Sequence, residues 1–229
     1  NLTVIGNANT ANVIRAQGMA RVSWDRVVAG VTARRAGSVG FRFSACHIND
    51  FANLACSTYL SAAVPATGVL LETGIRGGSP IGVQSTNNVF RRAMIEGPAI
   101  GIDLKEADQN TFISGTSEIC TSIGFRIQAG CRENTLIGVA LESPGATYDL
   151  DDWGWSNTLQ NCYSLGHVRL NGARAKIDGG LYQRIEISAS AVRARVERMS
   201  VNYKEAGPGL TNSGTGSTVA DVYDKAAEA

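Results

Sequence analysis

Short runs of alternating hydrophobic and polar residues recur along the middle of this 229-residue chain, at a spacing in the low twenties. Runs of this kind are typical of β-strands with one buried face. One recurring run reads Gly101-Ile102-Asp103-Leu104, Gly124-Phe125-Arg126-Ile127, Thr147-Tyr148-Asp149-Leu150 and His167-Val168-Arg169-Leu170. A fixed period of this size indicates repeats that stack and bury their apolar faces against one another.

A second recurring feature is an asparagine followed by a β-branched residue and then a large apolar residue. It occurs at Asn88, Asn110, Asn134 and Asn157, at intervals of 22, 24 and 23 residues. We expect these asparagines at a corner of the repeat, because asparagine adopts left-handed backbone angles more readily than most residues. Stacked side-chain amides can also hydrogen-bond from one repeat to the next. The apolar residues that follow, such as Phe112, Leu136 and Leu159, are then expected inside.

The length of the repeat indicates how its strands are arranged. A repeat of about 22–24 residues holds three short strands separated by bends. The third repeat divides into strands at Ile100–Lys105, Asn110–Ser114 and Ser117–Cys120. The consensus of leucine-rich repeats, which have a similar period, is absent. We therefore predict an all-β fold, a right-handed single-stranded parallel β-helix. This is a solenoid with three strands per coil and about 22–24 residues per coil.

In these features the chain resembles the right-handed parallel β-helix of the pectate-lyase-like superfamily. That superfamily includes polysaccharide lyases, polygalacturonases and many bacteriophage tailspikes. The resemblance covers roughly Gly40 to Met199 and depends on the spaced asparagines and the three-strand period. No residues match the calcium site of the lyases or the aspartates of the polygalacturonases. The resemblance therefore implies an architecture and no particular active-site residues.

The pattern divides the chain into three parts. Residues 1–39 are interpreted as irregular N-terminal coils of the β-helix, in a fragment of a longer polypeptide. Residues 40–202 are predicted to be the β-helix itself, with extra residues at His47–Ala66 and Thr73–Thr86 forming projecting loops. Residues 203–229 are predicted to be a Gly/Ser/Thr-rich C-terminal arm. Such an arm buries little apolar surface by itself, so we expect it against a neighbouring subunit.

Composition narrows the range of partners. The formal net charge is +1, so bulk electrostatics favour neither nucleic acid nor a membrane surface. No apolar run is long enough to insert across a bilayer. The five cysteines lack the paired spacing of zinc ligands and are expected to be small buried side chains, with a Cys120–Cys131 disulfide left open. We expect neither a metal nor a cofactor.

Two rows of charged residues follow from the predicted register. Asp103, Arg126, Asp149 and Arg169 face outward in successive coils with alternating sign, which stabilises the stack. Glu96, Glu118 and Glu142 each lie eight residues after a corner asparagine, and Leu165 takes this position in the next coil. Like charges at this spacing repel unless a cation, a proton or a buried partner compensates. Such a row can mark a functional site, and solvated carboxylates are the alternative explanation.

The segment from Tyr148 to Trp155 is the most distinctive local sequence. It places two tryptophans and three carboxylates close together, at Asp149, Asp151, Asp152, Trp153 and Trp155. Indole rings suit the C–H-rich faces of sugars, and paired carboxylates are the usual groups of glycoside hydrolysis. The alternative is that the tryptophans pack against the next coil or another subunit.

These observations give a set of candidate site residues. We predict Glu118, Glu142 and Asp152 as catalytic residues if the protein is an enzyme. Trp153, Trp155, Asp151 and Glu96 are predicted to bind substrate. One glutamate would need a raised pKa to donate a proton to the leaving oxygen.

The preferred functional interpretation is a virion-associated spike or fibre segment, a homotrimer that binds bacterial surface polysaccharide. Other virion proteins would then bind through parts of the polypeptide outside this chain. The alternative is a secreted or virion-borne polysaccharide lyase or glycoside hydrolase acting along the β-helix groove. A bacterial surface adhesin is a third class with the same expected fold. All three imply a virion or extracellular location.

Overall fold

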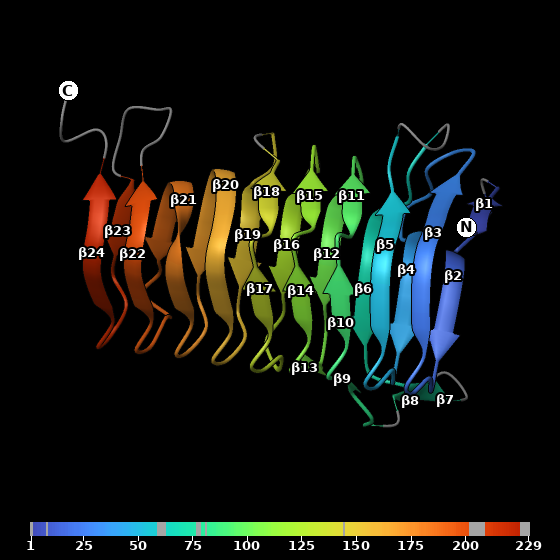
Figure 1. The fold of residues 1–229 in the computed structure, drawn as a ribbon, viewed down its shortest axis with the longest axis horizontal. Helices are drawn as coiled ribbons and strands as arrows, with labels where there is room; N and C mark the ends of the chain where they lie inside the picture. The colour runs from blue at the N-terminus through green and yellow to red at the C-terminus, as the bar shows by residue number, and fades with distance from the viewer. Residues whose placement is uncertain are drawn as a thin grey trace.

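The computed structural model describes residues 2–7, 9–58, 63–76, 79–80, 82–143, 145–201 and 209–224. Within these residues the chain forms β-strands and no helix. Nearly all strand pairs are parallel, and they lie side by side along the long axis of the molecule (Figure 1). Alternating apolar residues and glycine-containing corners account for this all-β structure.

The strands fall into three groups along the chain. The first group is β1 (Leu2–Gly6), β2 (Asn12–Gln17), β3 (Ser23–Val31), β4 (Val39–Ser44), β5 (Asp50–Cys56) and β6 (Thr67–Glu72). The middle group is β10 (Val89–Arg91), β11 (Met94–Glu96), β12 (Ile100–Leu104), β14 (Thr111–Ile113), β15 (Thr116–Glu118), β16 (Ile123–Ile127), β17 (Thr135–Ile137), β18 (Ala140–Glu142) and β19 (Tyr148–Asp152). The last group is β20 (Thr158–Leu170), β21 (Lys176–Ile187), β22 (Arg195–Val201), β23 (Leu210–Asn212) and β24 (Thr218–Asp224). Four two-residue strands complete the set: β7 (Ile75–Arg76), β8 (Ser79–Pro80), β9 (Ser85–Thr86) and β13 (Ala107–Asp108).

Each strand pairs with its counterpart one circuit further along the chain, and we call one such circuit a coil. β10, β14 and β17 are successive neighbours, as are β11, β15 and β18. β12, β16 and β19 form a third series. These boundaries agree closely with the three strands predicted in the third repeat. Twenty strands form one sheet in this way.

This sheet overturns the predicted fold class, a right-handed solenoid with three strands in every coil of about 22–24 residues. It is one continuous parallel sheet that closes around a single core. Three separate strands per coil occur only from β10 to β19, because β20 alone pairs with β17, β18 and β19. Strand partners in adjacent coils lie from 17 residues apart, as for Val168 and Ile185, to 39 residues apart, as for Asp50 and Val89. The regular period in the sequence is a property of the central coils only.

A ladder of side-chain amides runs along one corner of the molecule. Each asparagine donates from Nδ2 to Oδ1 of the next, over distances of 2.8, 2.9, 3.1 and 3.2 Å. The members, in order, are Asn49, Asn88, Asn110, Asn134 and Asn157, and all are buried. The same Oδ1 atoms accept the backbone N–H of the preceding asparagine. The predicted corner stack is confirmed, and Asn49 is a further member that the sequence pattern missed.

The left-handed backbone conformation at this corner belongs to a neighbouring column of residues. It occurs immediately before each ladder position, with φ between 54° and 62°. The column consists of Arg21, Ile48, Asn87, Gln109, Glu133, Ser156, Arg174, Arg193 and Gly216. The ladder asparagines themselves do not have positive φ. The prediction that asparagine occupies this corner for its left-handed tolerance was therefore wrong, and its role there is hydrogen bonding.

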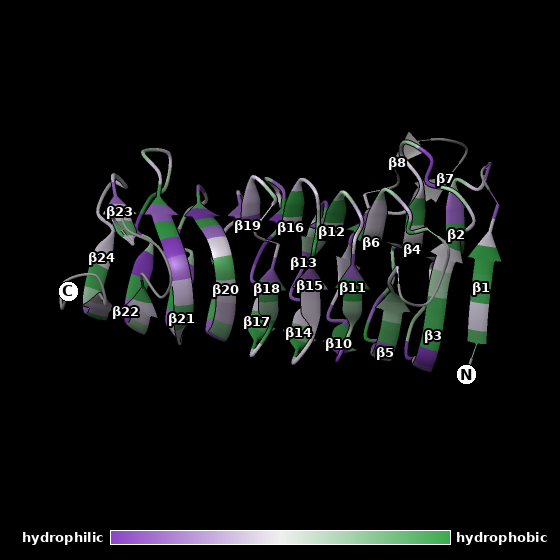
Figure 2. Ribbon diagram, turned by 90° about the horizontal axis from the view of Figure 1, so that it is seen from above, coloured by the Kyte–Doolittle hydropathy of each residue, from purple (hydrophilic) through white to green (hydrophobic). Residues whose placement is uncertain are grey.

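The core extends along the whole stack of coils. Phe112, Leu136 and Leu159 are buried in it, as the sequence predicted. Phenylalanine rings form a row through the first half, with centroid distances of 4.9 Å for Phe51–Phe90 and 4.7 Å for Phe90–Phe112. Figure 2 shows hydrophobic residues in the strands from one end of the molecule to the other. Stacking between coils therefore supplies most of the buried apolar surface.

The C-terminal segment also belongs to the sheet. β23 pairs with β21 and β24 pairs with β22. The predicted arm at 203–229 is thus corrected for residues 210–224, which continue the coils; residues 203–208 and 225–229 of that prediction lie outside the described residues. At the other end, β1 pairs with β3 and β3 with β5, so residues 1–39 contribute regular sheet pairing. The described residues contain no helical segment that could cross a bilayer.

Candidate functional site

The three glutamates lie in register at one edge of the sheet. Glu96 pairs with Glu118, and Glu118 pairs with Glu142. They are the last residues of β11, β15 and β18, which end at the upper edge in Figure 1. Adjacent strands are about 4.8 Å apart, so the carboxylates lie on neighbouring coils. The row predicted from the sequence is present.

The electrostatic environment of this row differs from one glutamate to the next. Glu96 is buried, and Ser57 Oγ donates a 2.6 Å hydrogen bond to its Oε2. Burial raises the pKa of Glu118, and the charges of Glu142 and Glu96 raise it further. None of the three forms an ion pair with another described residue. Glu118 therefore holds its proton more tightly than an isolated glutamate does.

Asp151 belongs to the alternating charged row on the outer face. Arg126 pairs with Asp103 on one side and with Asp151 on the other, and Asp151 pairs with Arg169. The sequence analysis placed Asp149 in this row, which was wrong by two residues. Asp149 is buried and accepts hydrogen bonds from Ser164 Oγ, Ser143 N and Gly166 N instead.

The contacts of Asp151 define a structural role. Arg169 Nε and Nη2 donate to its two oxygens at 2.9 and 3.0 Å. Trp153 Nε1 donates to Oδ2 at 3.0 Å, and Asn171 Nδ2 donates to Oδ1 at 2.8 Å. The carboxylate thus orients the Trp153 indole while its own charge is compensated by Arg169. Its contribution to a binding site is to hold that ring in place.

Asp152 points into the core at the end of the amide ladder. It is paired with Ile127 and Leu170, which are buried core residues. Its Oδ1 accepts hydrogen bonds from Asn157 Nδ2 at 2.9 Å and Gly154 N at 2.8 Å. Its Oδ2 is buried and has no hydrogen-bond partner within the described part of the chain. Burial raises the pKa of Asp152 to about 6.

The predicted catalytic set is not brought together. Glu142 comes before β19 and Asp152 ends it, so the five-residue strand separates them by roughly 15 Å. Asp152 is also enclosed, whereas Glu118 and Glu142 are partly exposed. Glu118 and Glu142 remain a candidate pair; their catalytic role stays a prediction.

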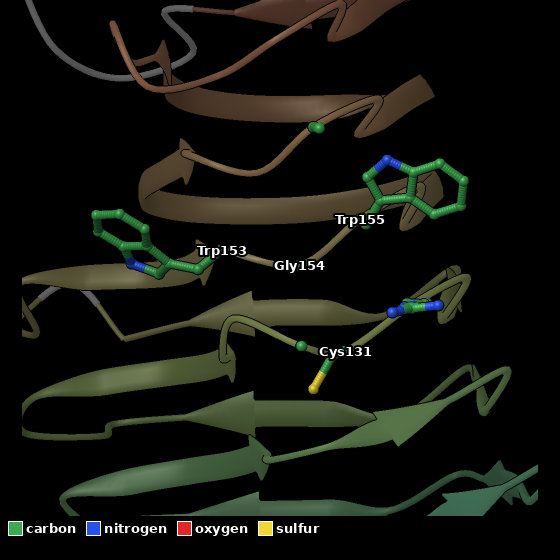
Figure 3. A pocket seen from close by; sticks show the side chains of 7 residues that line it. Cys131, Trp153, Gly154 and Trp155 are labelled. Atoms are coloured by element: carbon green, nitrogen blue, oxygen red, sulfur yellow. The ribbon is translucent and has the colours of Figure 1, made fainter.

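The tryptophans lie at the opposite edge, on either side of Gly154 (Figure 3). Trp153 is 45% exposed and Trp155 is 38% exposed. They border a hollow of about 500 Å³ whose other lining residues are Gly130, Cys131, Arg132, Gly154 and Ala173. A side chain at residue 154 would collide with the amide of Asn157, so glycine is required there. The floor of the hollow is therefore backbone and small side chains between two large aromatic walls.

Backbone pairing at this corner continues from one coil to the next. Trp155 pairs with Arg132 in the preceding coil and with Ala173 in the next. Arg132 in turn pairs with Asp108, and a second hollow of about 350 Å³ extends past Asp108 and Glu133. The two hollows share Arg132 and Trp155. Together they form a trough that crosses several coils along the corner.

The sequence analysis missed the basic residues of this corner. Arg174 and Arg193 occupy the left-handed column one and two coils beyond Ser156. The Arg174 guanidinium carbon lies 5.0 Å from the centroid of the Trp155 ring. Each arginine is followed by an alanine, Ala175 or Ala194, at the position that asparagine occupies in the earlier coils. The asparagine pattern therefore does not reveal these repeats. Aligning the later repeats by their strands, and not by the corner asparagine, would have identified both arginines.

The similarity of this chain to known proteins is low in both sequence and fold. No protein-family model and no curated protein sequence matches the chain. Among solved structures, alginate lyase from Paenibacillus sp. str. FPU-7 is similar, with a TM-score of 0.44 and 12% identity over 97% of this chain and 99% of that chain. Two structures of QnrB1, a plasmid-mediated fluoroquinolone resistance protein, each have a TM-score of 0.23. Their identities are 13% and 14%, over 89% and 90% of this chain and 90% and 91% of theirs. The first neighbour is a polysaccharide lyase and none of the three is a virion protein, but scores this low support no argument about function.

Proposed function

We propose that this chain binds polysaccharide along the corner that carries Trp153 and Trp155. The observation behind the proposal is the hollow between two exposed indoles, with a floor of glycine and alanine. Sugar rings stack on indole faces through their C–H groups, and a smooth floor lets a chain of sugars pass. Asp151 holds Trp153 in place, so part of the site is preorganised.

Binding is tested by affinity electrophoresis through gels that contain dextran, xylan, alginate or bacterial lipopolysaccharide. We expect retardation in at least one of these gels. Trp153→Ala and Trp155→Ala should each weaken binding about tenfold, the equivalent of about 1.4 kcal/mol. Tyr223→Ala is the matched control, because Tyr223 is equally exposed but lies on β24. If none of the four gels retards the wild-type protein, the proposal is wrong.

Polysaccharide cleavage is a second candidate function, favoured by the state of the glutamate row. The raised pKa of Glu118 suits a general acid, and the neighbouring Glu142 could act as the partner carboxylate. The coil spacing of about 4.8 Å is close to the separation of about 5–5.5 Å in retaining glycosidases. New reducing ends or unsaturated products should then appear with wild-type protein and disappear with Glu118→Gln.

A virion spike is a proposal about the biological role of the protein, beyond polysaccharide binding. Polysaccharide binding is common to the spike, enzyme and adhesin interpretations, so the tryptophan trough does not distinguish them. Homotrimer formation, binding of other virion proteins and a virion or extracellular location rest on the sequence resemblance alone. A stable trimer by analytical ultracentrifugation would favour the spike, and a monomer would favour the free enzyme.

A further inference from the structure

Two arginines beside the tryptophan trough have no ion-pair partner among the described residues. Arg174 and Arg193 both occupy the corner column, in adjacent coils about 4.8 Å apart. Neither forms an ion pair with a described residue, and both are exposed. Stacked like charges destabilise a sheet. In the charged row on the outer face, by contrast, Arg126 and Arg169 alternate with Asp103 and Asp151.

Charge is therefore distributed unevenly along the trough. Asp108 and Glu133 line the second hollow, on one side of Trp155. Arg174 and Arg193 follow on the other side, where the trough borders Ala173. Arg132 lies on the acidic side of Trp155, where it pairs with Asp108 in the sheet; burial raises the pKa of that carboxyl, and the charge of Arg132 acts to lower it. A ligand crossing this corner meets acidic side chains at one end and the guanidinium groups of Arg174 and Arg193 at the other.

The position of Arg174 links these charges to the sugar-stacking surface. Its guanidinium lies 5.0 Å from the Trp155 ring centroid, within the range of a cation–π contact. A sugar stacked on Trp155 therefore has its ring substituents close to Arg174. Guanidinium groups bind carboxylates and sulfates through paired, charge-assisted hydrogen bonds.

We propose that Arg174 and Arg193 recognise acidic groups on the bound polysaccharide, so that the ligand is a polyanionic glycan. This inference rests on the proposed function and specifies the class of its ligand. One carboxylate or sulfate on each of two successive sugars would neutralise the arginine pair. Neutral sugars would stack on the indoles and leave that pair uncompensated.

The test compares acidic and neutral oligosaccharides of equal length by isothermal titration calorimetry. Oligomers of alginate and of dextran are the probes. The double variant Arg174→Gln/Arg193→Gln should weaken binding of the alginate oligomer tenfold or more and flatten its salt dependence. The matched control is Arg195→Gln/Arg198→Gln. It removes two charges that are already paired, with Glu197 and Asp178.

The outcomes separate the two proposals. Equal affinity of the wild type for both oligomers, or equal weakening by both double variants, overturns the inference and leaves polysaccharide binding intact. Binding of the dextran oligomer alone has the same consequence. If the wild type binds neither oligomer and none of the four polysaccharides, the proposed function fails and the inference fails with it.

Discussion

At the scale of single residues, the amide ladder and the carboxyl that ends it are the most consequential features. Each ladder asparagine uses its side chain to connect two coils, and the last one, Asn157, donates to Asp152. One oxygen of Asp152 accepts this hydrogen bond, and the other has no hydrogen-bond partner in the ranges that the structure describes. A buried carboxylate with an unpartnered oxygen costs free energy when it is ionised. Asp152 thus completes the ladder and makes the folded state sensitive to pH.

Replacement of Asp152 by asparagine should reduce that sensitivity. The pKa of Asp152 is about 6 in the folded protein, against 3.8 for an unperturbed group. Because the folded state binds this proton more tightly, stability is fully retained below about pH 4 and is lost as pH rises through 6. The difference amounts to about 3 kcal/mol. We expect the free energy of unfolding of Asp152→Asn, measured in urea, to fall less than that of the wild type between pH 4 and 7.5.

Asp151→Asn is the control for this experiment. Asp151 is adjacent in sequence but faces outward and is compensated by Arg169. Its neutralisation should destabilise the protein at pH 7.5, by on the order of 1–3 kcal/mol. An identical pH profile for wild type and Asp152→Asn would show that Asp152 does not carry the effect.

At the scale of strands, the sequence predicts the alternating charged row but misplaces one member. The run Tyr148-Asp149-Leu150 was aligned so that Leu150 matched Ile127, which keeps an apolar residue at each inward position. The structure pairs Ile127 with Asp152 instead. A hydrophobic pattern cannot reveal this register, because a donor that stabilises the Asp152 carboxylate inside the core is the side-chain amide of Asn157, the last asparagine of the ladder. Hydrogen bonds from Gly154 and Asn157 here override the alternation of polarity along the strand.

The charged row gives a prediction about Arg126. Its guanidinium donates to Asp103 Oδ1 at 2.9 Å and Oδ2 at 2.6 Å, and Asp151 lies on its other side. Arg126→Asp would place three carboxylates in adjacent coils and should destabilise the protein more than Arg126→Met does. We expect about 1 kcal/mol between the two variants. Chemical denaturation at low and high sodium chloride should show the gap narrowing with salt, and a gap that is unaffected by salt would contradict the charge explanation.

At the scale of the whole molecule, the central coils could be predicted from the sequence and the end coils could not. Asn110 and Asn134 mark coils of nearly equal length with similar strands, so their period is visible in the sequence. Beyond Asn157 the ladder positions are Ala175 and Ala194, which have no amide to reveal the repeat. The tryptophan trough was found as a segment, but its arginines and the separation of Asp152 from the glutamates depend on how the coils stack. The sequence of a single repeat does not contain the register between coils.

The stack should unfold as a unit when its centre is disrupted. Leu136 is fully buried between Phe112 and Leu159 in the neighbouring coils. Leu136→Asp places an unpaired charge there, a cost of several kcal/mol that a marginally stable protein cannot offset. We expect the far-ultraviolet circular dichroism of a β-protein to be lost. Leu2→Asp is the control at an exposed end position, and it should remain folded.

The one-way ladder of amides also makes the molecule extensible. Every amide-to-amide hydrogen bond in it runs from one asparagine to the asparagine of the next coil, so Asn110 and Asn134 are interchangeable as links. A second copy of residues 110–133, inserted before Asn134, would find an acceptor ahead of it and a donor behind it. The molecule would lengthen by one strand spacing, about 4.8 Å. Each inserted coil would increase the distance between the phenylalanine row and the tryptophan corner by the same amount, so protein engineering could set that distance in fixed steps.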